Sequence, residues 1–243
     1  MNSYVIAIFC FGLMASCAAL ACEKSAFPVV IDVGHSAKAP GARSARGRWE
    51  IEFNRELAFK VAERLTTAGF PASALLAEGD SRSLVERAAR VNRLHPRLLI
   101  SIHHDSVQPR YLEEWQFNGQ TERYCDRYAG WSLFVSMSNS EAKQSLRFAR
   151  LLGASLLFRD LPFSKHHAEA IRGENKTLID SSLGVYQYDR LVILRQTNAP
   201  AVLLEAAVIA NRDEERLASS IERQALVADA IAGSVGKFCD GAN

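Results

Sequence analysis

Short apolar runs that end in a polar residue alternate along this chain with longer amphipathic segments. Residues 27–33 form such a run, closed by Gly34, and are typical of a buried strand. In residues 50–68, large apolar side chains recur at four-residue steps, the spacing of a helix with one buried stripe, and Gly69 follows as a C-terminal cap. Strands that alternate with helices predict an α/β fold, with helices on both faces of one sheet.

The alternation continues toward the C-terminus. Further strands are expected at residues 72–76, 98–103, 131–137, 191–194 and 201–204. Further helices are expected at residues 83–94, 141–158 and 213–235, the first capped by Ser83 with Glu86 in a capping box. Residues 105–130 and 162–190 lack a regular pattern. We interpret the first of these segments as an insertion and leave the second open.

The first residues of the chain differ in character from the rest. No charged side chain occurs from Tyr4 to Ala21, and this run ends in Ala19-Leu20-Ala21, the pattern of small residues at a signal-peptide cleavage site. We expect residues 1–21 to be a cleaved export signal and residues 22–243 to be the mature domain. A retained membrane anchor is one alternative, and a lipoprotein anchor at Cys17 is another.

Cleavage after Ala21 would leave three of the five cysteines, at positions 22, 125 and 239. Cys22 and Cys239 lie near the two ends of the mature chain, and the termini of a domain are often close in space. In an exported protein such a pair can form a disulfide, and three free thiols are the alternative. The net charge of +2 is too small to indicate a nucleic-acid partner.

Two histidines and a glutamate stand where an α/β fold gathers ligands. His35 and His103 each follow or end an apolar strand, and ligands collect at the carboxyl edge of such sheets. Glu50 opens the first helix after a loop that can return to the same edge. Zinc hydrolases use two imidazoles and a carboxylate when one coordination position stays open for water. The pattern therefore predicts one Zn²⁺ ion bound by His35, Glu50 and His103.

Two other residues bear on this prediction. His104 is the alternative to His103, but an extended chain alternates its faces, so only one of them should point at the metal. Glu205 follows residues 200–204, a run that should be buried, and a carboxylate there is costly unless it is paired or functional. We interpret Glu205 as the group that takes a proton from water and passes it to the departing amine. Taken singly, each of these residues also has a structural explanation, such as an ion pair or a helix start.

The motifs, in this order, resemble those of the zinc-dependent N-acetylmuramoyl-L-alanine amidases of the type 3 class, which are bacterial cell-wall hydrolases. The likeness covers roughly residues 28–236. Its motifs are Asp32-Val33-Gly34-His35, Glu50 ahead of Phe53-Asn54, Ser101-Ile102-His103-His104-Asp105 and Pro200-Ala201-Val202-Leu203-Leu204-Glu205.

The resemblance implies a fold, an activity and a location. The fold would be a single α/β domain with a twisted, roughly six-stranded sheet. His35, Glu50 and His103 would bind zinc and Glu205 would be the catalytic acid and base. The bond cut would be the amide between N-acetylmuramic acid and the L-alanine of a peptidoglycan or muropeptide stem, in the bacterial periplasm or cell envelope. We expect a monomer and no nucleic-acid partner.

The resemblance also raises points that the residues leave open. Residues 206–209 lack the glycine and aromatic that the family usually has after the glutamate. Some relatives carry a longer insertion that blocks the site until an activator protein removes it, so a glutamate of residues 105–130 could reach the metal: Glu113, Glu114 or Glu122. Residues considered for substrate binding are Arg48, Asn211, His166 and His167. A zinc peptidase or carboxypeptidase and a non-catalytic wall-binding protein remain as alternative functions.

Overall fold

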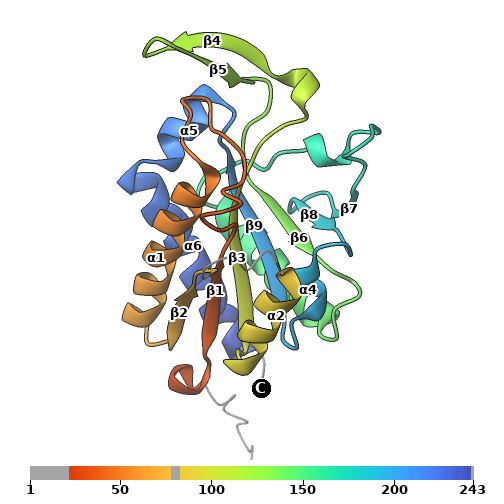
Figure 1. The fold of residues 1–243 in the computed structure, drawn as a ribbon. Coiled ribbons are helices and arrows are strands. Elements are labelled where there is room, and N and C mark those ends of the chain that lie inside the picture. Colours follow the sequence, from red (N-terminus) through yellow and green to blue (C-terminus); the bar gives the residue numbers. More distant parts are fainter. Residues whose placement is uncertain (1–21, 78–82, 242–243) are drawn as a thin grey trace, which may run out of the picture.

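Seven strands form a mixed sheet at the centre of the molecule (Figure 1). The computed structural model describes residues 22–77 and 83–241. The sheet order is β2-β1-β3-β9-β6-β8-β7, one strand more than the six expected. β2, β1, β3 and β9 are parallel, β6 is antiparallel to β9 and parallel to β8, and β7 is antiparallel to β8. The strands are β1 (Val29–Val33), β2 (Ala72–Leu75), β3 (Leu98–Asp105), β6 (Ser132–Val135), β7 (Thr177–Asp180), β8 (Val185–Gln187) and β9 (Ala201–Val208).

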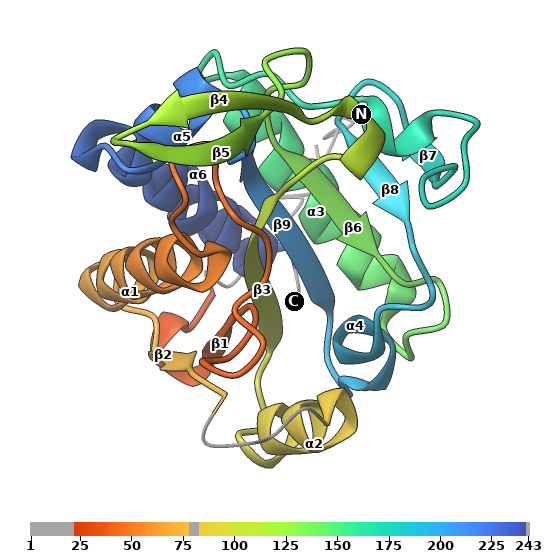
Figure 2. The ribbon, with the colours of Figure 1, turned by 45° about the horizontal axis from the view of Figure 1, so that its top comes forward.

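Helices cover both faces of this sheet, as the alternation of strands and helices predicted (Figure 2). Alternate residues of β1 separate the two sides: Ile31 packs in the core beneath α1, α3 and α6, whereas Val30 packs in the core beneath α2 and α4. Ile31 is fully buried, and burial of such a side chain contributes about 1.5–3 kcal/mol. The helices are α1 (Glu50–Thr67), α2 (Leu84–Arg93), α3 (Ala142–Leu157), α4 (Val192–Gln196), α5 (Arg212–Ala218) and α6 (Ile221–Asp240), with short 3₁₀ turns η1 (Lys24–Ala26), η2 (Pro109–Tyr111) and η3 (His166–Ala168).

Two elements differ from the sequence-based expectation. The segment 191–194, expected as a strand, belongs to α4, with Ile193 and Leu194 packed against the sheet. A short apolar run has no periodicity that separates a strand from a buried helical turn. The expected closing helix at 213–235 is two helices, because the hydroxyl of Ser220 accepts a hydrogen bond from Arg223 N over 3.2 Å and caps α6.

The two irregular segments also contain strands. Residues 162–190 hold η3, β7 and β8. Residues 105–130 hold a hairpin of β4 (Glu113–Phe117) and β5 (Gln120–Tyr124), which projects beyond the sheet near α5 (Figure 1). Its turn is Asn118-Gly119, with φ of 50° and 77°. An Asn-Gly pair with both φ angles positive is the usual two-residue turn of a hairpin, so this sequence signal could have predicted the element.

A disulfide joins Cys22, ahead of η1, to Cys239 near the end of α6. The two Cα atoms are 5.5 Å apart, within the usual range for a disulfide. Cys125 is a buried free thiol. The proposed export signal, residues 1–21, lies outside the described residues. Among the helices of the described residues, none is long and apolar enough to cross a membrane.

Candidate metal centre

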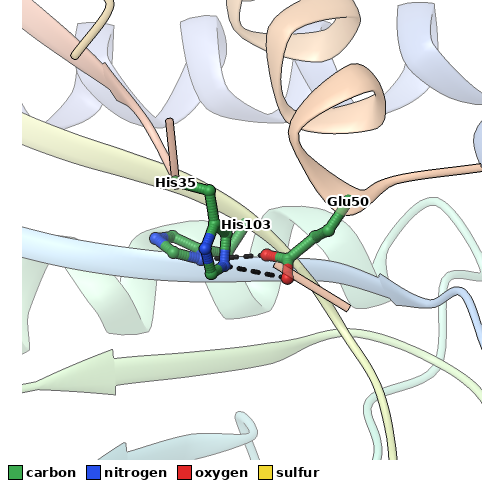
Figure 3. Close-up of side chains that lie close together, drawn as sticks. All are labelled: His35, Glu50 and His103. Carbon is green, nitrogen blue, oxygen red and sulfur yellow. Dashed lines mark hydrogen bonds and ion pairs between the residues drawn. The ribbon is translucent and has the colours of Figure 1, made fainter. Parts of the chain in front are cut away.

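The three predicted ligands converge at the carboxyl ends of β1 and β3 (Figure 3). His35 follows β1, Glu50 is the first residue of α1, and His103 lies near the end of β3. Glu50 Oε2 is 2.9 Å from His35 Nε2, and Glu50 Oε1 is 3.1 Å from His103 Nδ1. One ligand atom of each residue lies within 4.8 Å of the other two. Two imidazoles and a carboxylate grouped in this way fit a single divalent ion such as zinc.

The backbone brings these residues to one edge because β1 and β3 are adjacent parallel strands, with Asp32 opposite Ser101 in the register. The loop between β1 and α1 returns the chain to that edge: Glu50 N donates to Ala42 O over 2.9 Å, and Ile51 N donates to Pro40 O over 3.0 Å. The start of α1 is therefore tied to the loop that follows His35.

The Glu50 carboxylate is held from several sides. Ala42 N donates to Oε2 over 3.0 Å, and Asn54 Nδ2 and His104 N donate to Oε1 over 3.2 and 3.3 Å. Burial would raise the pKa of Glu50, but hydrogen bonds and charge from His103 and His35 outweigh burial and hold that pKa well below its usual range. Glu50 is therefore ionised, as a metal ligand must be.

His104 points to the opposite face of β3. Its Nδ1 lies 2.8 Å from Asn54 Oδ1, and its ring packs 5.6 Å from that of Phe53. Burial lowers the pKa of His104 to about 3, so the ring is neutral at physiological pH. It belongs to no metal-compatible group of the described residues. The alternation of a strand thus assigns His103 and His104 to different partners.

Two residues to which the sequence analysis gave no role hold His35 in place. Asp32 and Arg87 form a buried ion pair, and Arg87 Nη1 also donates to the carbonyl of His35 over 3.0 Å. His35 has a φ of 70°, a left-handed conformation that costs a non-glycine residue about 1–3 kcal/mol. The bond from Arg87 stabilises that conformation. Asp32 is the first residue of the motif ending in His35, but its distant partner left no sequence signal.

Two glycines allow the ligands to approach the backbone. A Cβ at Gly34 would lie 2.5 Å from His103 Nε2, and one at Gly41 would lie 2.3 Å from Glu50 Oε2. Gly41 also has a φ of 84°, in the region that favours glycine. Any side chain at these positions would displace a ligand.

Glu205 lies on β9, directly opposite His103 in the parallel register. Its Oε2 is buried and has no hydrogen-bond partner among the described residues. Burial, together with the charges of Asp105 and Glu50, raises the pKa of Glu205 well above its usual value. A buried carboxyl group with a raised pKa has the character of a general acid.

The residues considered for substrate binding have other contacts. Arg48 donates to Glu56 Oε1 over 2.7 Å and to Ser219 Oγ over 2.9 Å. The Asn211 side chain caps α5, accepting from Glu214 N over 3.1 Å. Substrate contact by Arg48 or Asn211 stays a prediction. His166 and His167 lie buried beside Asp105, in a cluster separate from the three candidate ligands.

The three glutamates of the insertion contact residues other than the candidate metal ligands. Glu122 pairs with Arg43 over 2.6 Å, and Glu113 accepts from the Tyr124 hydroxyl over 2.9 Å. Glu114 is exposed and lies 3.7 Å from Arg123. None of the three is in a metal-compatible group of the residues described. The insertion forms a β-hairpin, and it supplies no ligand to the cluster of His35, Glu50 and His103.

A cavity of about 370 Å³ opens beside two of the candidate ligands, His35 and His103. Arg87 and Asp32 line one part of it. Most of its other walls are apolar side chains from α2, α4, the residue before α4, and β9: Leu84, Leu191, Val192, Ile193 and Leu203. A mostly apolar cavity with a few convergent polar groups is typical of a small-molecule or peptide site.

The sequence of residues 29–237 matches the N-acetylmuramoyl-L-alanine amidase family. The chain belongs to this family. Its members hydrolyse the amide bond between N-acetylmuramic acid and L-alanine in peptidoglycan, and this chain is an amidase of that type. The motifs that suggested the type 3 class all lie within the matched residues, and the assignment made from them is confirmed. No curated protein sequence matches the chain.

Solved structures of amidases share this fold. The amidase Ami1 of Mycobacterium smegmatis superposes with a TM-score of 0.67 at 20% identity, covering 90% of this chain and 99% of that one. An amidase of Clostridium difficile 630 gives 0.64 at 20% identity, covering 90% and 100%. The CwlD amidase of Clostridioides difficile, solved in complex with the GerS lipoprotein, gives 0.62 at 18% identity, covering 87% and 98%. The single α/β domain is therefore the amidase fold.

Proposed function

We propose that this amidase is zinc-dependent, with His35, Glu50 and His103 as the metal ligands and Glu205 as the catalytic acid and base. The observation that carries the proposal is the convergence of an ionised, buried glutamate with two histidines, opposite a carboxyl group of raised pKa. Zinc bound there would act as a Lewis acid toward the attacking water and the amide carbonyl.

The residues of the chain hold the metal ion and transfer the proton. Glu50 and the two histidines fix the ligand positions, and the bond from Arg87 to the His35 carbonyl keeps that ligand oriented. Glu205 accepts a proton from the attacking water and delivers it to the nitrogen of the departing L-alanine. Its raised pKa supports this role, because a raised pKa makes the carboxylate a stronger base toward water.

The cavity beside His35 supports a place for one arm of the substrate. Its apolar walls suit the methyl groups and backbone of a stem peptide. Peptidoglycan lies outside the cytoplasm, so we also propose that the chain is exported to the periplasm or cell envelope, with residues 22–243 as the zinc amidase domain. A protein activator, by analogy with the lipoprotein complex of CwlD, is part of the same proposal.

Digestion of purified muropeptides tests the activity and the roles together. The products of the wild-type protein, of a chelated sample and of Glu205→Gln are identified by mass spectrometry. The wild type should release stem peptides that begin with L-alanine, and added Zn²⁺ should restore the chelated sample. Glu205→Gln should retain zinc and lose about 10²–10⁴-fold in turnover.

Glu63→Gln is the matched control, because Glu63 is exposed on α1 and pairs only with Lys60 in the structure as described. It should keep full activity. Shortened stems in place of whole stems would indicate a peptidase, and bound but unchanged muropeptides would indicate a wall-binding protein. Loss of zinc from Glu205→Gln would show that Glu205 is a ligand and not the proton carrier.

A further inference from the structure

A second group of two histidines and a carboxylate lies just beyond the end of the first. Asp105 is the last residue of β3, and His166 and His167 form the start of η3. Asp105 Oδ2 lies 3.1 Å from His166 Nε2 and 2.8 Å from His167 Nε2. One ligand atom of each lies within 4.8 Å of the others. This cluster uses none of the residues proposed for the catalytic ion.

The facing atoms of this cluster are buried and make no hydrogen bonds. Oδ2 of Asp105 and Nε2 of both histidines have no partner of acceptable geometry among the described residues, despite their short separations. The side chains of His166 and His167 expose only 2% and 10% of their surface. Buried polar atoms are almost always satisfied, and these three atoms, which lie at ion-pair distance without hydrogen-bond geometry, would be satisfied by a shared cation.

The opposite nitrogens of the two rings are firmly engaged. His166 Nδ1 lies 2.7 Å from Ser164 Oγ, and His167 Nδ1 lies 2.9 Å from Glu174 Oε2. A carboxylate can only accept, so His167 Nδ1 carries the proton in that contact. Burial lowers the pKa of His167, but the charges of Asp105 and Glu174 and the hydrogen bonds to them outweigh burial and raise that pKa to about 9, so a metal ion would displace the proton on Nε2. The ring would then stay protonated at Nδ1 and present a lone pair at Nε2, toward Asp105. Metal-binding histidines characteristically donate their other nitrogen to a carboxylate or hydroxyl in this way.

Glu174 is in turn held in place by two donors. Gln108 Nε2 donates to its Oε1 over 2.6 Å, and Lys176 Nζ donates to its Oε2 over 3.1 Å. The carboxylate that orients His167 therefore has a fixed position, as the supporting shell of a metal site requires.

We propose that Asp105, His166 and His167 bind a second divalent transition-metal ion. Imidazole nitrogens favour Zn²⁺, Co²⁺, Ni²⁺ or Fe²⁺ over Mg²⁺ and Ca²⁺, which prefer oxygen ligands. The ion joins η3 and the segment before β7 to the end of β3. This site requires no catalysis and stands independently of the function proposed above.

The second ion is separate from the first. The two ligand sets share no residue. They are two separate groups of candidate ligands at the same edge of the sheet.

Metal stoichiometry decides the proposal. The purified protein is stripped with a chelator, dialysed against Zn²⁺ and analysed by elemental mass spectrometry and calorimetry. The wild type should hold two zinc ions per chain, and Asp105→Asn and His167→Ala should each hold one. His35→Ala should also hold one, retained by the second cluster. His95→Ala is the control, because His95 is exposed, precedes β3 and belongs to neither group of candidate ligands among the described residues, and it should hold two.

Three outcomes would overturn the proposal. The wild type could bind a single ion that is lost in His35→Ala, which would mean that the second cluster is an ion-pair network with a protonated His167. His167→Ala could still bind two ions. A folded Asp105→Asn could show the same Co²⁺ absorption spectrum as the wild type. The number of ions bound by the wild type requires no variant. A failure of Asp105→Asn to fold therefore does not remove the test.

Failure of the catalytic proposal gives a different pattern. If His35, Glu50 and His103 hold no ion, His35→Ala keeps the wild-type stoichiometry while His167→Ala loses an ion.

Discussion

The buried ion pair behind His35 offers a quantitative test of how the candidate ligands are held. The side chains of Asp32 and Arg87 expose 2% and 8% of their surface. Ser101 adds a hydroxyl bond to Asp32 Oδ2 over 2.7 Å. Arg87→Met keeps much of the apolar length of the side chain but leaves the carboxylate without its cation. A buried charge that loses its partner costs about 3–5 kcal/mol.

This loss is large against the total stability of a domain, about 5–15 kcal/mol, so Arg87→Met should fold but unfold at a lower urea concentration. Unfolding is measured with a chelator present, because a bound metal would add stability of its own. The double variant Asp32→Asn/Arg87→Met has no unpaired charge and should recover most of the lost free energy. Asp32→Asn alone leaves Arg87 unpaired and is the fourth corner of the cycle.

Zinc affinity distinguishes the two roles of Arg87, which are pairing with Asp32 and positioning His35. Arg87 Nη1 supports the His35 carbonyl, and the double variant lacks that donor as much as Arg87→Met does. Both should bind zinc about 10–100-fold more weakly in calorimetry, even though their stabilities differ. Strictly additive stability losses would refute the buried-charge argument, and an unchanged zinc affinity in Arg87→Met would refute the positioning of His35.

Two further predictions concern the neighbours of the ligands. Gly34→Ala should weaken zinc binding at least about tenfold in calorimetry, because its Cβ would lie 2.5 Å from His103 Nε2. Gly233→Ala, whose Cβ would have no heavy atom within 4 Å, is its control and should keep the affinity. Burial lowers the pKa of His104 from 6.5 to about 3, so in the metal-free protein only the unfolded chain takes up this proton between those pH values. The free energy of unfolding should therefore increase as the pH rises from about 3 to 6.5, by up to about 1.4 kcal/mol per pH unit from this group. His104→Asn should flatten the slope in urea titrations, and an unchanged slope would contradict the assignment.

The fold was largely predictable because its ligand-bearing strands have local signals. The run before His35 and the run ending at His103 are apolar and short, and parallel strands end at one edge. The sequence therefore indicated which side chains to bring together. It did not separate α4 from a strand, because five residues are too few to show a helical period.

Long-range partners were beyond the sequence. Arg87 lies on α2 and meets Asp32 only after the helix packs on the sheet, so no spacing rule connects them. His166 and His167 stand in a segment without periodicity, and their burial depends on contacts with β3. The composition of such a segment does not show whether it will form a surface loop or a buried cluster.

The tripeptide His103-His104-Asp105 shows how one strand serves three partners. Side chains of a strand alternate, so His103 and Asp105 share one face and His104 takes the other. On the first face, His103 joins Glu50 and Asp105 joins His167, while His104 packs against Asn54 of α1. A register shift of one residue would place His104 at the metal centre and bury both of its neighbours beneath α1. The pairing of β3 with β1 and β9 thus determines which partner each side chain of this tripeptide meets.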